Sequence, residues 1–118
     1  MPNVVEAESN DTFAKSQAIT GTPTVISGTL ASTADVDFYR ITIPAGRRVV
    51  ATLPANSAVG FGLGVYLSAS QPLGQILGSP GQALSFTVSN SGTTAVTVAL
   101  RVSRASGGTG SYKLSLAP

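Results

Sequence analysis

Apolar and polar residues alternate along most of this chain, and a period of two residues is typical of a β-strand with one buried face. In the stretch 37–43, for example, Tyr39, Ile41 and Ile43 share one side, whereas Arg40 lies on the other. Clusters of Gly, Pro, Asn and Ser interrupt the alternation, as expected for turns. The pattern predicts strands over residues 24–30, 37–43, 48–53, 61–68, 73–77, 83–89, 94–103 and 111–116.

Strands with a single apolar face bury it when two sheets pack face to face. We therefore expect an all-β fold, a jelly-roll-like β-sandwich of about eight antiparallel strands that forms one domain over residues 1–118. The one helical signal is near the start of the chain. There, polar residues 9–12 provide capping side chains, and residues 13–18 are long enough for a short helical turn.

Composition agrees with a small globular domain and excludes several chemistries. Charged residues make up 10% and hydrophobic residues 42% of the 118 residues, which is enough apolar material for a core. The chain has no histidine and no cysteine, so it holds no Ser-His-Asp triad, no Cys-His dyad, no HExxH zinc site and no disulfide.

A membrane-spanning segment and a nucleic-acid partner are also disfavoured. No apolar run is long enough to span a membrane. The net charge of +2 comes from scattered bases, which argues against nucleic acid as a partner. The first residues do not have the pattern of a signal peptide, so we expect that an export signal would precede this chain.

The five acidic residues are concentrated in two clusters. They are Glu6, Glu8, Asp11, Asp35 and Asp37, and none occurs in residues 38–118. Like charges brought together repel one another, and a bound cation or nearby bases must offset that cost. Neither cluster contains a base, and side chains two residues apart project the same way from an extended chain. Each cluster therefore directs a pair of carboxylates toward one point.

Oxygen ligands without histidine or cysteine favour calcium or magnesium, and calcium tolerates the irregular geometry of a site built from loops. We therefore predict a calcium site. A second interpretation stays open, in which Asn10 and Asp11 cap a helical turn while Asp35 and Asp37 lie in a solvated turn. A glycosidase pair of carboxylates is disfavoured, because the chain has no tryptophan and few aromatic rings to stack a sugar.

The predicted strand 61–68 places glycines opposite its apolar side. Phe61, Leu63, Val65 and Leu67 share one face, and the other face begins with the two glycines at positions 62 and 64. Glycine inside a strand is costly unless something approaches closely. We expect a flat, exposed patch here, which would serve either as a shallow groove for a polymer chain or partner domain, or simply as an accommodation of packing.

Several segments, taken in order, resemble the bacterial pre-peptidase C-terminal domain. They are residues 6–13 (EAESNDTF), 28–30 (GTL), 35–39 (DVDFY), 43–46 (IPAG) and 108–114 (GTGSYKL). The resemblance implies an extracellular β-sandwich of jelly-roll type that is appended to secreted metallo- and serine proteases and other exported enzymes. The family includes the collagen-binding domains of clostridial collagenases.

The resemblance also implies a calcium ligand set. The positions that match the family's ligands are Glu6, Glu8, Asn10, Asp11, Asp35 and Asp37, with Gly28 and Thr29 where backbone or hydroxyl oxygens contribute. Two departures stand out. The usual acidic strand of the type DLDLYL here reads GLGVYL, and the stretch 98–104 lacks the tyrosines of the collagen-binding members. Collagen binding is therefore not expected.

Taken together, the residues and the resemblance predict a non-catalytic, calcium-stabilised accessory domain of a secreted bacterial enzyme such as a protease. It would assist secretion or folding, or bind a substrate or surface. Its expected partner is the parent enzyme or an extracellular polymer, and we expect a monomer. The alternative is a stand-alone structural or adhesin module of a cell-surface protein, and a small hydrolase in its own right is the least favoured interpretation.

Overall fold

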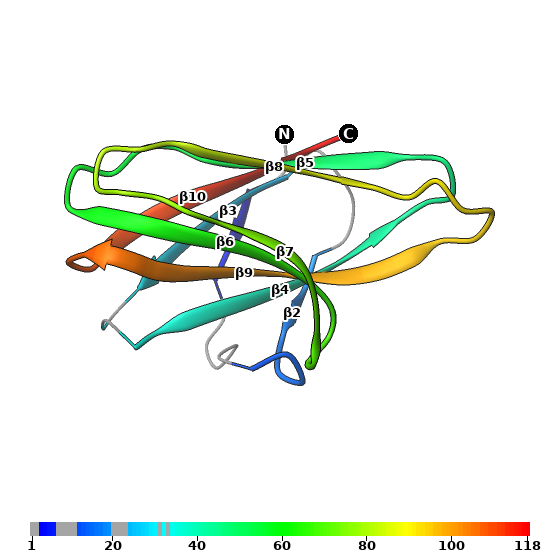
Figure 1. Ribbon diagram of the computed structural model, residues 1–118, viewed down its shortest axis with the longest axis horizontal. Coiled ribbons are helices and arrows are strands. Elements are labelled where there is room, and N and C mark those ends of the chain that lie inside the picture. Colours follow the sequence, from blue (N-terminus) through cyan, green and yellow to red (C-terminus); the bar gives the residue numbers. More distant parts are fainter. Residues whose placement is uncertain (1–2, 7–11, 20–23, 31, 33) are drawn as a thin grey trace.

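Two five-stranded sheets pack face to face in the computed structural model, which describes residues 3–6, 12–19, 24–30, 32 and 34–118 (Figure 1). The first sheet has the order β1-β3-β10-β5-β8, with strands Asn3–Val5, Thr24–Leu30, Gly110–Ala117, Arg48–Leu53 and Leu84–Ser89. The second sheet has the order β2-β4-β9-β6-β7, with strands Gln17–Ala18, Val36–Ile43, Val96–Gly107, Val59–Ser68 and Gln71–Leu77. The predicted all-β sandwich is confirmed.

The chain crosses between the sheets at nearly every connection. From β3 to β6, and again from β7 to β10, each strand lies in the sheet opposite to its predecessor, whereas β6 and β7 form a hairpin within one sheet. As a result β4 starts at the left-hand end of the sandwich in Figure 1 and leads to the β4–β5 turn at the right-hand end. The start of β4 and the β4–β5 turn, which carries the basic residue Arg47, therefore lie at opposite ends of the sandwich.

Two edge strands were not predicted, and both are parallel to their neighbours rather than antiparallel. β1 runs beside β3, and β2 runs beside β4. They contain three and two residues, which is too short for a period of two to be recognised. Among the described residues no helix is long and apolar enough to cross a membrane.

The helical turn predicted over residues 13–18 is wrong. The structure has two overlapping turns instead, in which the N–H groups of Lys15 and Ser16 donate to the carbonyl oxygens of Thr12 and Phe13. The chain then joins β2, and the N–H of Ile19 donates to the Arg40 carbonyl at 2.9 Å. Pairing with β4 thus takes the hydrogen bonds that a helix would have needed. The proposed capping residues at 9–11 lie outside the described residues.

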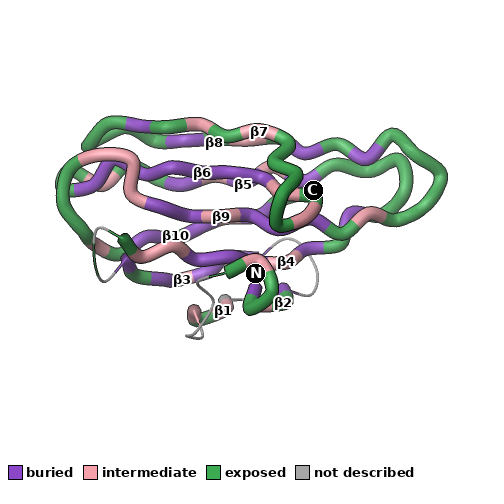
Figure 2. The backbone as a smooth tube through the Cα atoms, turned by 60° about the horizontal axis from the view of Figure 1, so that its bottom comes forward, coloured by how far each residue is buried: buried purple, intermediate pink, exposed green. Residues whose placement is uncertain are grey.

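The core lies between the sheets, where the inward faces of the central strands are buried (Figure 2). The alternation predicted from the sequence holds for Tyr39, Phe61, Leu63 and Val65, which are all 0% exposed. Leu67 was assigned to the same face, but it is exposed. The pairing of β6 with β7 shifts register on either side of the residue at position 66, and such an irregularity turns the following side chains away from the expected face.

The prediction of a flat, exposed patch at Gly62 and Gly64 is also wrong, because both glycines are buried. A Cβ at position 62 would lie 2.6 Å from the Ser103 hydroxyl oxygen, and one at position 64 would lie 3.2 Å from the Tyr66 ring. Arg101 covers the same region, with its guanidinium carbon 5.4 Å from the centre of the Tyr66 ring. The glycines therefore accommodate neighbouring side chains, as the second interpretation held.

Candidate functional site

A buried polar network closes the left-hand end of the core. Asp37 follows the inward alternation of β4 and is 0% exposed. The hydroxyl of Tyr112, on β10 of the opposite sheet, donates to Asp37 Oδ2 at 2.5 Å. The hydroxyl oxygens of Tyr112 and Tyr39 are also 2.5 Å apart. A tyrosine hydroxyl has one hydrogen, and Tyr112 gives its own to Asp37, so Tyr39 donates to Tyr112.

The network keeps Tyr112 protonated. Burial raises the pKa of its hydroxyl far above the ordinary value near 10, and the neighbouring Tyr39 and the hydrogen bond to Asp37 act in the same direction. Ionisation would place a new negative charge beside a carboxylate in a site with little water. Tyr112 is therefore a constant hydrogen-bond donor to Asp37.

Gly28 makes room for this arrangement. It pairs directly with Tyr112 across β3 and β10, and a Cβ at this position would lie 2.5 Å from the Cζ atom of the tyrosine ring. Phe61 packs edge-on against the same ring, with the ring centres 5.9 Å apart. Any side chain at position 28 would push the ring, and with it the hydroxyl, away from Asp37.

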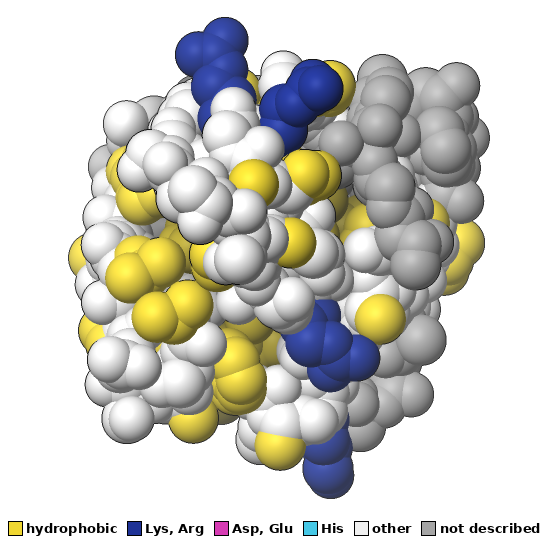
Figure 3. All heavy atoms as spheres, turned by 90° about the vertical axis from the view of Figure 1, so that its right-hand side faces the viewer, with side chains coloured by type: hydrophobic (Ala, Val, Ile, Leu, Met, Phe, Trp, Pro, Cys, Tyr) yellow, Lys and Arg dark blue, Asp and Glu magenta, His cyan; other side chains and the backbone are white. Residues whose placement is uncertain are grey.

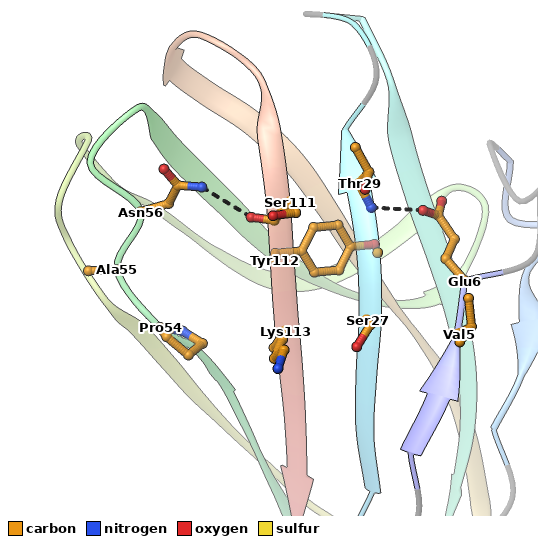
Figure 4. Close-up of a pocket in the computed structure, with 11 residues that line it drawn as sticks. Val5, Glu6, Ser27, Thr29, Pro54, Ala55, Asn56, Ser111, Tyr112 and Lys113 are labelled. Carbon is orange, nitrogen blue, oxygen red and sulfur yellow. Dashed lines mark hydrogen bonds between the residues drawn. The ribbon is translucent and has the colours of Figure 1, made fainter.

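Strand β1 brings Glu6 to the same end of the molecule. Its parallel pairing with β3 is extended by the Glu6 N–H, which donates to the Ser27 carbonyl at 2.8 Å. The Glu6 carboxylate then accepts a hydrogen bond from the Thr29 N–H at 2.9 Å (Figure 4). The carboxylate of half-buried Glu6 is thus held at the C-terminal end of β3, one residue from Gly28.

The structure therefore connects four of the eight predicted ligand positions, Glu6, Gly28, Thr29 and Asp37, through backbone neighbours and hydrogen bonds. Asp35 is half-buried just before β4, and its N–H donates to the Ser32 carbonyl at 3.1 Å. The other three positions, Glu8, Asn10 and Asp11, lie outside the described residues. Within the described ranges, no three acidic side chains gather closely enough to hold a metal by themselves.

The donors present suit a hard cation in kind. Glu6, Asp35 and Asp37 offer carboxylate oxygens, and the strand end at Gly28 and Thr29 offers carbonyl and hydroxyl oxygens. Oxygen-only donor sets of this type are the ones that calcium prefers. The remaining ligands would have to come from the N-terminal acidic cluster.

A hollow of about 530 Å³ lies beside Glu6, on the outer side of the first sheet (Figure 4). Its walls are formed by Glu6 and Thr29 on one side and by the loop 54–56 on the other. Lys113 lies between these walls, on β10. Asn56 fixes the loop, because its side-chain amide donates to the Ser111 carbonyl at 3.1 Å. The volume is within the range of roughly 300–1,000 Å³ that is usual for small-molecule sites.

Sequence reasoning missed the two tyrosines of the network. Tyr112 and Tyr39 were assigned to the apolar inward faces of their strands, and Asp37 was considered only as a metal ligand. An acidic residue in phase with buried residues along a strand was the available signal, because a buried charge needs a partner. The partner itself lies 75 residues away along the chain, which no local pattern reveals.

Comparison with known proteins relates this chain to others by fold alone. No family model matches the chain, and no curated protein matches its sequence. The structure is similar to the pre-peptidase C-terminal domain of a collagenase from Bacillus anthracis, with a TM-score of 0.64 and 16% identity over 86% of this chain and 93% of that one. The two chains therefore share a fold.

A weaker likeness concerns PliG of Aeromonas hydrophila, a periplasmic inhibitor of g-type lysozyme. Its TM-score is 0.48 and its identity 9%, over 97% of this chain and 98% of that one. A likeness at this level carries no argument about function.

Proposed function

We propose that this chain is a non-catalytic accessory domain of a secreted bacterial enzyme, for example a protease, and that calcium stabilises it. In this role it assists secretion or folding of the parent enzyme, or binds a substrate or surface. The fold shared with the pre-peptidase C-terminal domain of a collagenase supports the proposal. So does the absence of histidine and cysteine from the sequence, which removes the usual nucleophile–base pairs.

The observation that carries the calcium part is the placement of Glu6. Strand β1 holds its carboxylate at the Thr29 amide, at the end of the sandwich where β4 begins and where Asp37 is its second residue. The N-terminal acidic cluster continues from Glu6 through Glu8 to Asp11. A cation bound between the two clusters would hold the N-terminal segment against the start of β4 and would offset the repulsion between the carboxylates.

Thermal unfolding with and without calcium tests this proposal. Extracellular calcium modules have dissociation constants of about 10⁻⁴–10⁻³ M, so a few millimolar calcium stabilises the fold by about 1–2 kcal/mol. For a domain of this size that raises the Tm by about 4–15 °C relative to EGTA. Magnesium at the same concentration should raise the Tm less, because it needs tighter octahedral geometry.

The variant for this experiment is Glu8→Gln combined with Asp35→Asn, which leaves the buried Asp37 network untouched. We expect its melting curves with calcium and with EGTA to coincide, while its circular dichroism stays that of the wild type. Coincident curves for the wild type would contradict the proposal. So would an equal shift in the variant, because the stabilisation would then arise elsewhere on the molecule.

A further inference from the structure

The right-hand end of the sandwich, opposite the start of β4, is held together by hydrogen bonds of Asn90. The Asn90 side-chain amide donates to the carbonyl oxygens of Ile43 at 2.9 Å and Thr94 at 2.8 Å. Its N–H donates to the Arg47 carbonyl at 2.8 Å, and its Oδ1 accepts from the Gly92 N–H at 3.0 Å. One buried side chain thus joins the β4–β5 turn to the β8–β9 loop, so this end is ordered before any partner arrives.

The core is open at this end through a hollow of about 200 Å³, which we call the apolar pit. Its inner wall consists of the core residues Ile43, Val88 and Val98, which are at most 8% exposed. Leu73 and Val96 form its outer wall, and Leu73 is 55% exposed. The hollow is well below the roughly 300–1,000 Å³ of pockets that enclose a whole small molecule, so it fits a single large side chain.

Two exposed arginines flank the apolar pit. Arg47 and Arg48 line a second hollow of about 230 Å³, which shares Ser89, Asn90 and Ser91 with the pit. The face of this end shown in Figure 3 has apolar atoms beside basic groups, and no acidic side chain is visible among the coloured atoms. Of the acidic residues that the structure describes, Glu6 and Asp37 lie at the other end of the sandwich, and Asp35 lies there too, just before β4. Within the described part of the chain, this end is therefore both positive and apolar.

We propose that this end docks an acidic segment of a protein partner that carries a large apolar residue. The apolar side chain fills the pit, and neighbouring carboxylates of the segment pair with Arg47 and Arg48. The planar guanidinium group suits carboxylates, to which it donates two parallel hydrogen bonds. The Asn90 hydrogen bonds keep the entropic cost of binding low, because the loops need no ordering.

Size and charge favour a protein segment over other occupants. A fatty acyl chain is too long for a pit that fits one side chain, and two adjacent arginines are too few for the many phosphate contacts on which nucleic-acid affinity depends. The surface lies away from Glu6 and Asp37 and does not involve calcium. The inference therefore goes beyond the proposed function and does not depend on it.

Selection from a library of random linear peptides displayed on phage tests the inference, with the folded domain as the target. We expect enriched sequences that combine at least two acidic residues with Leu, Ile or Phe. A synthetic peptide of the enriched sequence, added to isotope-labelled domain, should shift the amide resonances of Arg48, Ser91 and Val96. Arg47→Glu combined with Arg48→Glu should weaken the peptide at least about tenfold, and Leu73→Ser should weaken it about fivefold.

The matched control is Lys15→Glu combined with Lys113→Glu, which makes the same change in net charge at exposed positions elsewhere. It should change the affinity less than about twofold. Enrichment of no sequence, or of sequences without acidic residues, would overturn the inference, as would equal weakening by the control. Self-association of the domain that depends on Arg47 and Arg48 would also overturn it, because the occupant would then be a second copy. The dispersed amide spectrum of each variant verifies that it folds.

Discussion

The two ends of the sandwich close the same core in opposite ways. At the left-hand end, Asp37, Tyr112 and Tyr39 form hydrogen bonds across the two sheets, so the end is sealed by buried polar groups. At the right-hand end, Asn90 braces the loops but leaves an apolar hollow open to solvent. The first arrangement makes stability depend on charge and protonation, whereas the second leaves rigid apolar surface available for contact.

The largest effect should come from removing the Tyr112 hydroxyl. Tyr112→Phe takes the hydrogen bond from the buried Asp37 carboxylate, and we expect the free energy of unfolding to fall by about 3 kcal/mol. Tyr39→Phe is the matched variant, because it removes a hydrogen bond between two neutral hydroxyls and should lower the free energy by about 1 kcal/mol. Urea unfolding measures both. Losses of equal size would show that the contact with Asp37 has no special weight.

At the opposite end, Asn90→Ala should cost about 2 kcal/mol, because the buried carbonyl oxygen of Ile43 and the partly buried one of Thr94 lose their donor. Ser91→Ala is the control at the exposed neighbouring position, and it should change stability by less than about 0.5 kcal/mol. Urea unfolding again provides the measurement. A cost for Asn90→Ala as small as that of the control would mean that the loop is not held by this side chain.

The smallest of these effects concerns alkaline pH. The folded-state pKa of Tyr112 is raised above the unfolded value of about 10, so the unfolded chain loses this proton first. The stability that depends on it is fully present below pH 10 and declines above it, by up to about 1.4 kcal/mol per pH unit. Urea unfolding between pH 9 and pH 11 should therefore show a steeper decline for the wild type than for Tyr112→Phe. Parallel declines would contradict this account.

Local patterns in the sequence predicted the strands well where the alternation is long and uninterrupted. The predicted ranges 24–30 and 48–53 coincide with β3 and β5. Prediction failed where geometry depends on contacts distant in sequence. β1 and β2 are too short to show a period, Leu67 follows a shift of register between β6 and β7, and the patch expected at Gly62 is covered by Ser103 from another strand.

The candidate site, too, could be predicted from the sequence only in part. The sequence places Asp37 in phase with the inward residues of β4, and it places acidic residues near the N-terminus. It does not reveal that β1 runs parallel to β3 and thereby brings Glu6 to Thr29. Nor does it reveal that Tyr112 lies over Gly28 and reaches Asp37 from the opposite sheet. These contacts depend on how the two sheets are stacked.

The most direct test of the calcium proposal is a calcium titration followed by the amide resonances of the isotope-labelled domain. The Thr29 amide donates to Glu6 Oε1, so its resonance reports on that carboxylate. We predict a saturable shift of the Thr29 and Asp35 amides with a dissociation constant of about 10⁻⁴–10⁻³ M, and loss of that shift in Glu8→Gln combined with Asp35→Asn. Shifts that do not saturate, or that are the same with magnesium, would contradict a calcium site at this end of the sandwich.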